Sequence, residues 1–156
     1  MSKKSWIPDV LPIARIEDHH THYLGQCADG KLFWGYFTFA FEAPPGRNFP
    51  GSDWQEFRRE YAVLHLFDDD GNYLKTHHWY GGKTSECDQA DMEEKLKAMV
   101  SALGPVEFED IYIKPFQTEI DGITFGLIPN DEYETIDLEP SDTISFHEPW
   151  NGEYDT

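Results

Sequence analysis

The stretch REYAVLHLFDDDGNYLKTHHWYGG, residues 59–82, consists of two apolar runs joined by one acidic turn. Residues 61–67 and 73–80 are rich in aromatic and branched side chains, contain neither glycine nor proline, and have the length of ordinary strands. The aspartates between them can hydrogen-bond nearby backbone, and Gly71 accepts a positive φ without a Cβ clash. The stretch therefore predicts a β-hairpin with a short loop that ends at Gly71.

The register of this hairpin decides which side chains share a face. If Asp68 pairs with Asn72, the residues on one face are Ala62, Leu64, Leu66, Leu74, Thr76, His78 and Tyr80. The residues on the other face are Tyr61, Val63, His65, Phe67, Tyr73, Lys75, His77 and Trp79. Both faces are too apolar for a hairpin bathed in water, so we expect it at the centre of a sheet with one face under a helix. A slip of one residue in the loop exchanges the faces of one strand.

The covering helix is predicted over residues 89–103. Asp88 is a suitable N-cap, and an apolar stripe recurs at three- and four-residue spacing before Gly104 and Pro105 end the helix. The residues of that stripe are Met92, Leu96, Met99, Val100 and Leu103. Further strands are expected before and after this core, over residues 21–27, 32–41, 106–113, 116–120 and 123–128. The predicted class is α+β: a mainly antiparallel sheet of about six to nine strands with one principal helix on one face.

Length and composition predict one domain over residues 1–156. A chain of 156 residues buries roughly two thirds of the surface that it exposes when unfolded. Cys27 and Cys87 lie in separate regions without metal-ligand or redox spacing, which favours free thiols in a reducing compartment over a disulfide. The amino-terminal stretch has no sustained apolar run, so we expect neither a signal peptide nor a membrane span and place the protein in the cytoplasm.

The charge of the chain restricts its partners. The formal net charge is −18, from 30 acidic and 12 basic residues. Binding to DNA, RNA or anionic lipid needs clustered Lys and Arg, so we expect no direct nucleic-acid contact and no membrane partner. The same charge favours association with a basic protein.

Motifs for catalysis or cofactor binding are weak. His20 and His22 form one local pair and His65 and His77 another, whereas a zinc site needs three or four convergent ligands. The acidic run that ends at Gly71 lacks the spacing of a calcium loop, and the chain has neither a nucleophile elbow nor a P-loop. We therefore predict no catalytic, metal or cofactor residues and no cofactor.

The acidic carboxyl-terminal segment is the best candidate for a functional surface. From residue 129 to residue 156 there is no Lys or Arg, while carboxylates alternate with aromatic residues. One interpretation is a closing strand with a solvated acidic edge. The other is a partner-binding surface, because aromatic anchors beside complementary charge are common at protein interfaces. The candidate partner-binding residues are Trp150, Tyr154, Glu148, Glu153, Asp155, Tyr133 and Glu134.

Three segments together resemble a known family. The hairpin stretch YAVLHLFDDDGNYLKTHHWYGG, the downstream IYIKPFQTEIDGITFGLIP and the closing FHEPWNGEYDT are similar in order and character to small bacterial proteins labelled formate hydrogenlyase regulatory proteins. The resemblance covers the chain from about Pro12 onward. It implies a non-enzymatic transcriptional regulator that works in the cytoplasm, and it assigns no site residues.

Three functional hypotheses follow from these observations. The first is a non-catalytic acidic protein that modulates a basic protein partner, either as a regulator or as an immunity-type inhibitor of a nuclease toxin. The second is a small metal- or histidine-dependent hydrolase that uses His65, His77 or His78 with nearby carboxylates. The third is a structural subunit without activity of its own. The charge and the lack of a catalytic motif favour the first.

Overall fold

The structure is a computed structural model that describes residues 6–16, 20–41 and 53–156, with only the backbone described at Asp53 and Trp54. The first strands are β1 (Leu11–Ile13), β2 (Tyr23–Cys27), β3 (Leu32–Phe41), β4 (Arg58–Phe67) and β5 (Tyr73–Lys83). The helices are the 3-10 turn η1 (Asp53–Glu56) and α1 (Gln89–Ser101). The later strands are β6 (Val106–Phe108), β7 (Ile111–Ile113), β8 (Gln117–Ile120), β9 (Ile123–Asn130), β10 (Thr135–Glu139), β11 (Ser145–Phe146) and β12 (Tyr154–Asp155).

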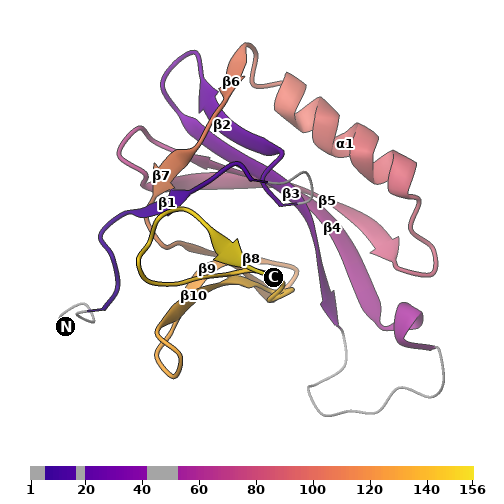
Figure 1. Ribbon diagram of the computed structural model, residues 1–156. Coiled ribbons are helices and arrows are strands. Elements are labelled where there is room, and N and C mark those ends of the chain that lie inside the picture. The colour runs from indigo at the N-terminus through magenta and orange to yellow at the C-terminus, as the bar shows by residue number, and fades with distance from the viewer. Residues whose placement is uncertain (1–5, 17–19, 42–52) are drawn as a thin grey trace.

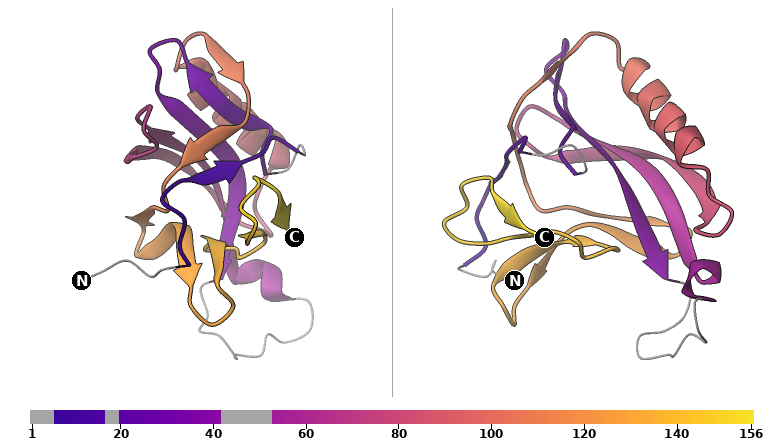
Figure 2. Two further views of the ribbon diagram at one scale, coloured as in Figure 1. Left: turned by 60° about the vertical axis from the view of Figure 1, so that its left-hand side comes forward. Right: turned by 45° about the vertical axis from the view of Figure 1, so that its right-hand side comes forward.

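The described part of the chain forms three layers. A long five-stranded antiparallel sheet has the order β5-β4-β3-β2-β6, and a second five-stranded sheet has the order β12-β11-β10-β9-β8. Helix α1 covers one face of the long sheet, and the second sheet lies on the other side (Figures 1 and 2). β1 and β7 form a short two-stranded sheet beside them. The predicted α+β class with one principal helix is confirmed, but the strands divide among three sheets and do not form one.

The hairpin of residues 59–82 is present as β4 and β5, and its turn has the predicted geometry. Gly71 is in the left-handed region with φ 86°, and its N–H donates to the Asp68 carbonyl at 3.0 Å. The Asp68 N–H donates to the Asn72 carbonyl at 2.9 Å, which is the pairing that the sequence predicts. The carboxylate of Asp68 accepts the backbone N–H groups of Asp70 and Asn72, so it holds the loop closed.

The predicted faces of the hairpin are wrong for β5. Phe67 pairs with Tyr73, but Leu66 pairs with Lys75, so Leu74 is an extra residue at a bulge. Beyond the bulge, the β5 side chains lie on the opposite face of the hairpin from the one predicted, because the side-chain period of a strand is two. Thr76 therefore stands opposite His65, and His77 stands on the α1 side, so His65 and His77 do not share a face as predicted.

The hairpin is also not at the centre of the sheet. Within the described residues β5 pairs with β4 alone, and β3 is the middle strand. β4 is buried on both faces, since every residue from 61 to 67 is buried. Leu74, Lys75, His77, His78 and Tyr80 of β5 are exposed, which is the pattern of an edge strand.

Helix α1 begins and packs as its sequence predicts. The Asp88 side chain accepts the Ala90 N–H at 2.9 Å, which satisfies one of the free donors of the first turn. Met92, Leu96 and Val100 are buried against the long sheet, and Met99 and Leu103 pack at the edge of the same cluster. Gly104 follows with φ 84°, as expected for a residue that ends a helix.

The second sheet packs on the face of the long sheet opposite α1. The ring of Tyr61 meets the ring of Phe125 edge to face with centroids 5.3 Å apart, and the Phe67 and Phe116 rings do the same at 5.0 Å. The Tyr61 hydroxyl also donates to Asp121 at 3.0 Å. One apolar cluster contains residues of both five-stranded sheets and of the β1–β7 pair, so the carboxyl-terminal segment is part of the core.

The hairpin turn predicts a matched pair of substitutions. An alanine Cβ at Gly71 would lie 2.8 Å from the Ile113 Cα and the Tyr112 carbonyl oxygen, whereas at Gly30, which has φ 94°, it would meet nothing within 4 Å. We expect Gly30→Ala to lower the free energy of unfolding by about 1 to 2 kcal/mol, the cost of a left-handed alanine. We expect Gly71→Ala to cost about 1 to 3 kcal/mol more, because the turn must also move away from β7. Equal losses in urea unfolding would contradict this packing.

Candidate functional site

The structure brings most of the predicted carboxyl-terminal site residues to one end of the second sheet. Thr135 pairs with Asn130 and Ile136 with Phe146, so the turn of residues 131–134 and the loop of residues 147–153 leave the sheet at the same end. We call the following residues the C-terminal acidic surface: Tyr133, Glu134, Glu148, Trp150, Glu153 and Asp155. Trp150 is half-buried, and the other five are exposed.

A pair of tryptophans joins the two loops of this surface. Trp150 stacks on Trp6 with ring centroids 6.4 Å apart and an angle of 19° between the planes. The Trp6 indole N–H donates to the Asp131 carboxylate at 3.3 Å. The Ala14 N–H donates to the Gly152 carbonyl at 2.9 Å, which ties the second loop to the chain just after β1. These contacts fix the relative position of the loops.

The aromatic residues predicted as anchors have different surroundings. Tyr133 is 69% exposed at the tip of its turn. Tyr154 is 9% exposed; its ring packs edge to face on Phe146, and its hydroxyl lies 3.1 Å from Thr21 Oγ1. Tyr154 is thus a core residue, and we leave it out of the C-terminal acidic surface. Its neighbour Asp155 points outward and contacts His147 Nε2 at 3.0 Å.

The outer face of the second sheet carries crowded carboxylates. Burial, followed by the nearby Asp142 and Asp137 carboxylates, raises the pKa of Glu139 above its ordinary value. Burial and then Asp137 likewise raise the pKa of Asp142. Asp137 itself accepts hydrogen bonds from Thr135 and Ser145 hydroxyls, which are neutral donors. Residues 129–156 contain no Lys or Arg, so no such side chain of this segment neutralises the carboxylates on the sheet.

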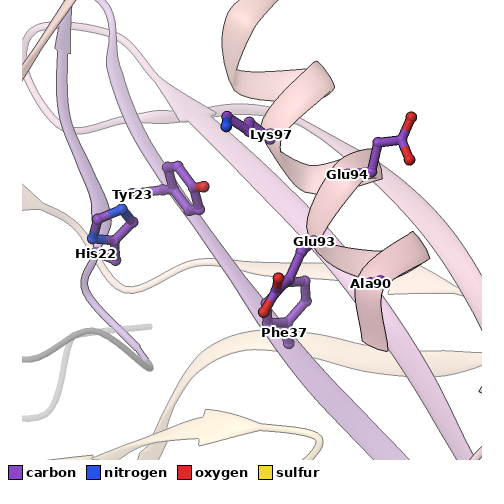
Figure 3. A pocket seen from close by; sticks show the side chains of 7 residues that line it. All are labelled: His22, Tyr23, Phe37, Ala90, Glu93, Glu94 and Lys97. Atoms are coloured by element: carbon purple, nitrogen blue, oxygen red, sulfur yellow. The ribbon is translucent and has the colours of Figure 1, made fainter. Parts of the chain in front are cut away.

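A groove that the sequence analysis did not anticipate runs between α1 and the β2–β3 edge. Its first part has a volume of about 560 Å³ and is lined by His22, Tyr23, Phe37, Ala90, Glu93, Glu94 and Lys97. Figure 3 shows Glu93 extending toward Phe37 and Lys97 extending toward Tyr23, while Glu94 points away. Charged helix residues thus overhang an aromatic floor that comes from the sheet.

The groove continues along β3 past the end of β2. The second part, of about 660 Å³, shares Phe37 and Glu93 with the first. Its other lining residues are His20, Thr38, Phe39, Arg58, Glu60 and Gln89. Thr38 is only 3% exposed, and its Oγ1 has no hydrogen-bond partner among the residues that the structure describes. We call the two parts together the helix groove.

Two signals in the sequence could have indicated this groove. The run of residues 32–41 is longer than the run of residues 21–27 that precedes it, so part of β3 must extend past its neighbour. Phe37 and Phe39 alternate with Thr38, which predicts aromatic side chains on one face of that part. The position of α1 above β3, β4 and β5 is a tertiary contact that no local pattern specifies.

The histidines do not form a metal site within the described residues. His65 is fully buried, with Nε2 2.8 Å from the Tyr36 hydroxyl and Nδ1 2.7 Å from Thr76 Oγ1. The buried Tyr36 hydroxyl has no other acceptor in the described structure, so it donates to Nε2, and the Nδ1 N–H donates to Thr76. Burial lowers the pKa of His65 to about 3, which keeps the ring neutral. His19, part of the histidine-rich run near the amino terminus, lies outside the described residues.

The acidic run in the hairpin turn is the one cluster of potential metal ligands in the described residues. Oxygen atoms of Asp68, Asp69 and Asp70 lie within 4.8 Å of one another. The Asn72 side chain donates to the Asp68 carboxylate at 3.0 Å, and this hydrogen bond lowers the pKa of Asp68. The Asp68 carboxylate therefore stabilises the turn by accepting hydrogen bonds, as the sequence predicts.

The described residues contain no helix with the length and apolar character needed to cross a membrane. Cys27 and Cys87 are both free thiols, and burial raises the pKa of each, which disfavours the reactive thiolate.

Comparisons with protein-family models, with curated proteins and with solved structures find no match for this chain.

Burial of neutral His65 predicts a pH-dependent stability. Its pKa is lower in the folded than in the unfolded chain, so below about pH 6.5 the unfolded chain binds a proton that the folded chain does not. Stability should fall as the pH falls, by about 2 kcal/mol between pH 7 and pH 5.

Urea unfolding of the wild type and of His65→Gln across this range measures the effect. The variant should be less stable at pH 7 and should lose less stability on acidification. The exposed His78→Gln should retain the wild-type dependence. A wild-type stability that is flat from pH 7 to pH 5, or that is just as steep in His65→Gln, would contradict the assignment.

Proposed function

We propose that this protein is a non-catalytic binding protein that modulates a basic protein partner through its C-terminal acidic surface. The observation that carries the proposal is the combination of an exposed aromatic residue and a tryptophan pair with carboxylates that have no Lys or Arg beside them in sequence. Aromatic side chains supply apolar contact area at protein interfaces, and unbalanced charge attracts and orients a partner of opposite sign.

The surface is suited to binding because its parts are already ordered. Asn130 Oδ1 accepts the backbone N–H groups of Glu132 and Tyr133 at 3.0 and 3.4 Å, which fixes the turn that presents Tyr133. The stacked tryptophans hold the loop that carries Glu148 beside that turn. A surface held in one conformation loses less entropy when it binds.

The crowded carboxylates on the second sheet support a cationic partner. Burial is the main cause that raises the pKa of Glu139 and of Asp142, and the neighbouring carboxylates raise it further, because ionisation of one opposes ionisation of the next. A partner that brings Lys or Arg side chains to this sheet relieves the repulsion. The favourable interaction is stronger for Arg, which pairs with carboxylates through two parallel hydrogen bonds.

Two kinds of basic protein fit the proposal. A DNA-binding regulator would be modulated by a protein that covers its cationic surface, in agreement with the regulatory role that the family resemblance implies. A nuclease toxin would be inhibited in the same way. In both cases the partner, and not this acidic chain, contacts nucleic acid.

A charge-reversal experiment tests the proposal. Glu134, Glu148 and Glu153 are changed together to Lys, and the tagged protein is used to capture partners from native lysate at low and moderate salt. We expect the wild type to retain a basic protein and the variant to retain about tenfold less, because three interface charges change sign. Quantitative mass spectrometry measures the difference, and the identity of the captured protein distinguishes a regulator from a toxin.

The matched control changes Asp69, Asp70 and Asp91 to Lys, which reverses the same number of exposed carboxylates on the hairpin turn and on α1. This control should bind like the wild type. Recovery of no basic protein at either salt concentration would contradict the proposed function. Equal loss in both triple variants would show that net charge, and not the C-terminal acidic surface, determines binding.

A further inference from the structure

The loop between β11 and β12 contains an asparagine that is followed by a glycine, Asn151–Gly152. Every other asparagine of the sequence, including Asn72 and Asn130, is followed by a residue with a side chain. A glycine has no Cβ that would hinder attack of its backbone nitrogen on the preceding side chain. Asn151 is therefore the asparagine whose amide is most open to reaction with its own backbone.

The fold brings the reacting groups together. Asn151 Oδ1 accepts the Glu153 backbone N–H at 3.1 Å, so the side chain folds back along the Gly152 peptide, which brings its Cγ toward the Gly152 nitrogen. The same hydrogen bond stabilises the negative charge that develops on Oδ1 when Cγ is attacked. Asn151 is exposed, so water reaches the site.

The packing of the loop requires the glycine. Gly152 is buried with φ 94°, and a Cβ at this position would lie 3.0 Å from the Ala14 Cβ. The Gly152 carbonyl accepts the Ala14 N–H at 2.9 Å, which holds the loop against the chain after β1. The fold thus keeps in place the residue that makes Asn151 reactive.

Two other asparagines provide internal comparisons. The side-chain NH₂ groups of Asn72 and Asn130 donate to aspartate carboxylates at 3.0 Å, and both residues are half-buried. Asn130 also forms the same kind of local turn, since its Oδ1 accepts the Glu132 N–H at 3.0 Å. Because the residue after Asn130 has a Cβ, a comparison of Asn130 with Asn151 measures the effect of the glycine.

We propose that Asn151 is a self-modification site, which the folded protein converts slowly to aspartate or isoaspartate. The Gly152 nitrogen loses its proton to a base from the solvent and attacks the Asn151 Cγ. The side-chain nitrogen takes up a proton from water and leaves as ammonia, and a succinimide ring remains. Water then opens the ring at one of its two carbonyl groups. The reaction involves no oxidation or reduction.

The two products change the C-terminal acidic surface in different ways. Aspartate adds a negative charge between Glu148 and Glu153 and keeps an oxygen that accepts the Glu153 N–H, so the loop retains its shape. Isoaspartate lengthens the main chain by one atom, so we expect Gly152 to lose its hydrogen bond with Ala14. The consequence for partner binding rests on the proposed function, whereas the modification itself does not.

Tandem mass spectrometry of the incubated full-length protein tests the modification. At about pH 8, fragments that contain Asn151 should gain about 1 Da at least about tenfold faster than fragments that contain Asn72 or Asn130. The gain should be slower at about pH 6, because the attacking nitrogen must lose its proton. Asn151→Ser, whose hydroxyl can accept the Glu153 N–H but which has no amide to lose, should show no gain.

The chain unfolded in urea gives the reference rate for the same reaction. We expect the folded protein to react more slowly than this reference by less than about tenfold, because a surface loop opens at a low free-energy cost. Absence of a gain at Asn151 in the folded protein would overturn the inference. Equal rates at Asn130 and Asn151 would also overturn it, since the glycine would then have no effect.

Hydrogen exchange at the Ala14 amide tests the change in the loop without any partner. The products are separated by ion exchange, and Asn151→Asp is the reference for the aspartate form. That form should keep the wild-type exchange rate at Ala14, whereas the isoaspartate form should exchange at least about tenfold faster. An unchanged rate in the isoaspartate form would contradict the proposed effect on the loop.

Partner capture separates this inference from the proposed function. Asn151→Asp should retain the basic protein at least as well as the wild type, and the isoaspartate form should retain less, because its loop is displaced. If the modification is found while no form captures a basic protein, the proposed function is wrong and the modification site stands. If both products bind like the wild type, the proposed effect on the C-terminal acidic surface is wrong.

Discussion

Burial of the long sheet on both faces is the constraint on which the rest of the structure depends. All residues from 61 to 67 are buried, so β4 needs apolar partners above and below it. Leu64 packs in the cluster that contains Leu96 of α1, and Tyr61 and Phe67 pack in the cluster of the second sheet. A single helix and a second sheet meet this requirement together, which gives the three-layer arrangement in Figure 1.

This constraint links the acidic carboxyl-terminal segment to the fold. Apolar residues of β9, β10 and β11 are needed to cover the long sheet, and in strands their neighbours must point the other way. The carboxylates that alternate with them are thereby displayed on one outer face, and residues 129–156 supply no Lys or Arg to pair with them. The turn of residues 131–134 and the loop of residues 147–153, which carry most of the C-terminal acidic surface, are attached to these strands. The packing that stabilises the core therefore also positions the surface to which we assign the function.

Local sequence patterns predicted much of this fold, and their limits have physical causes. The turn at Gly71, the cap at Asp88 and the apolar stripe of α1 depend on neighbouring residues, and all three are present. The faces of β5 were predicted wrongly because a bulge at Leu74 changes the register without a local marker. Division of the strands into three sheets depends on long-range packing. For the same reason the sequence suggested Tyr154 as an anchor, although it is buried. The aromatic residues of β3 were visible in the sequence, but the position of α1 that completes the helix groove was not.

Hydrogen exchange of the full-length protein tests most directly whether the acidic segment is held by the same core as the central hairpin. Because β4 and β9 contribute to one apolar cluster, amides in the middle of both strands should exchange at a common slowest rate, set by global unfolding. Addition of urea should accelerate both by the same factor. If amides of β9 and β10 exchange much faster than those of β4 and respond less to urea, the second sheet opens independently, and the account of a shared core that orders the binding surface is wrong.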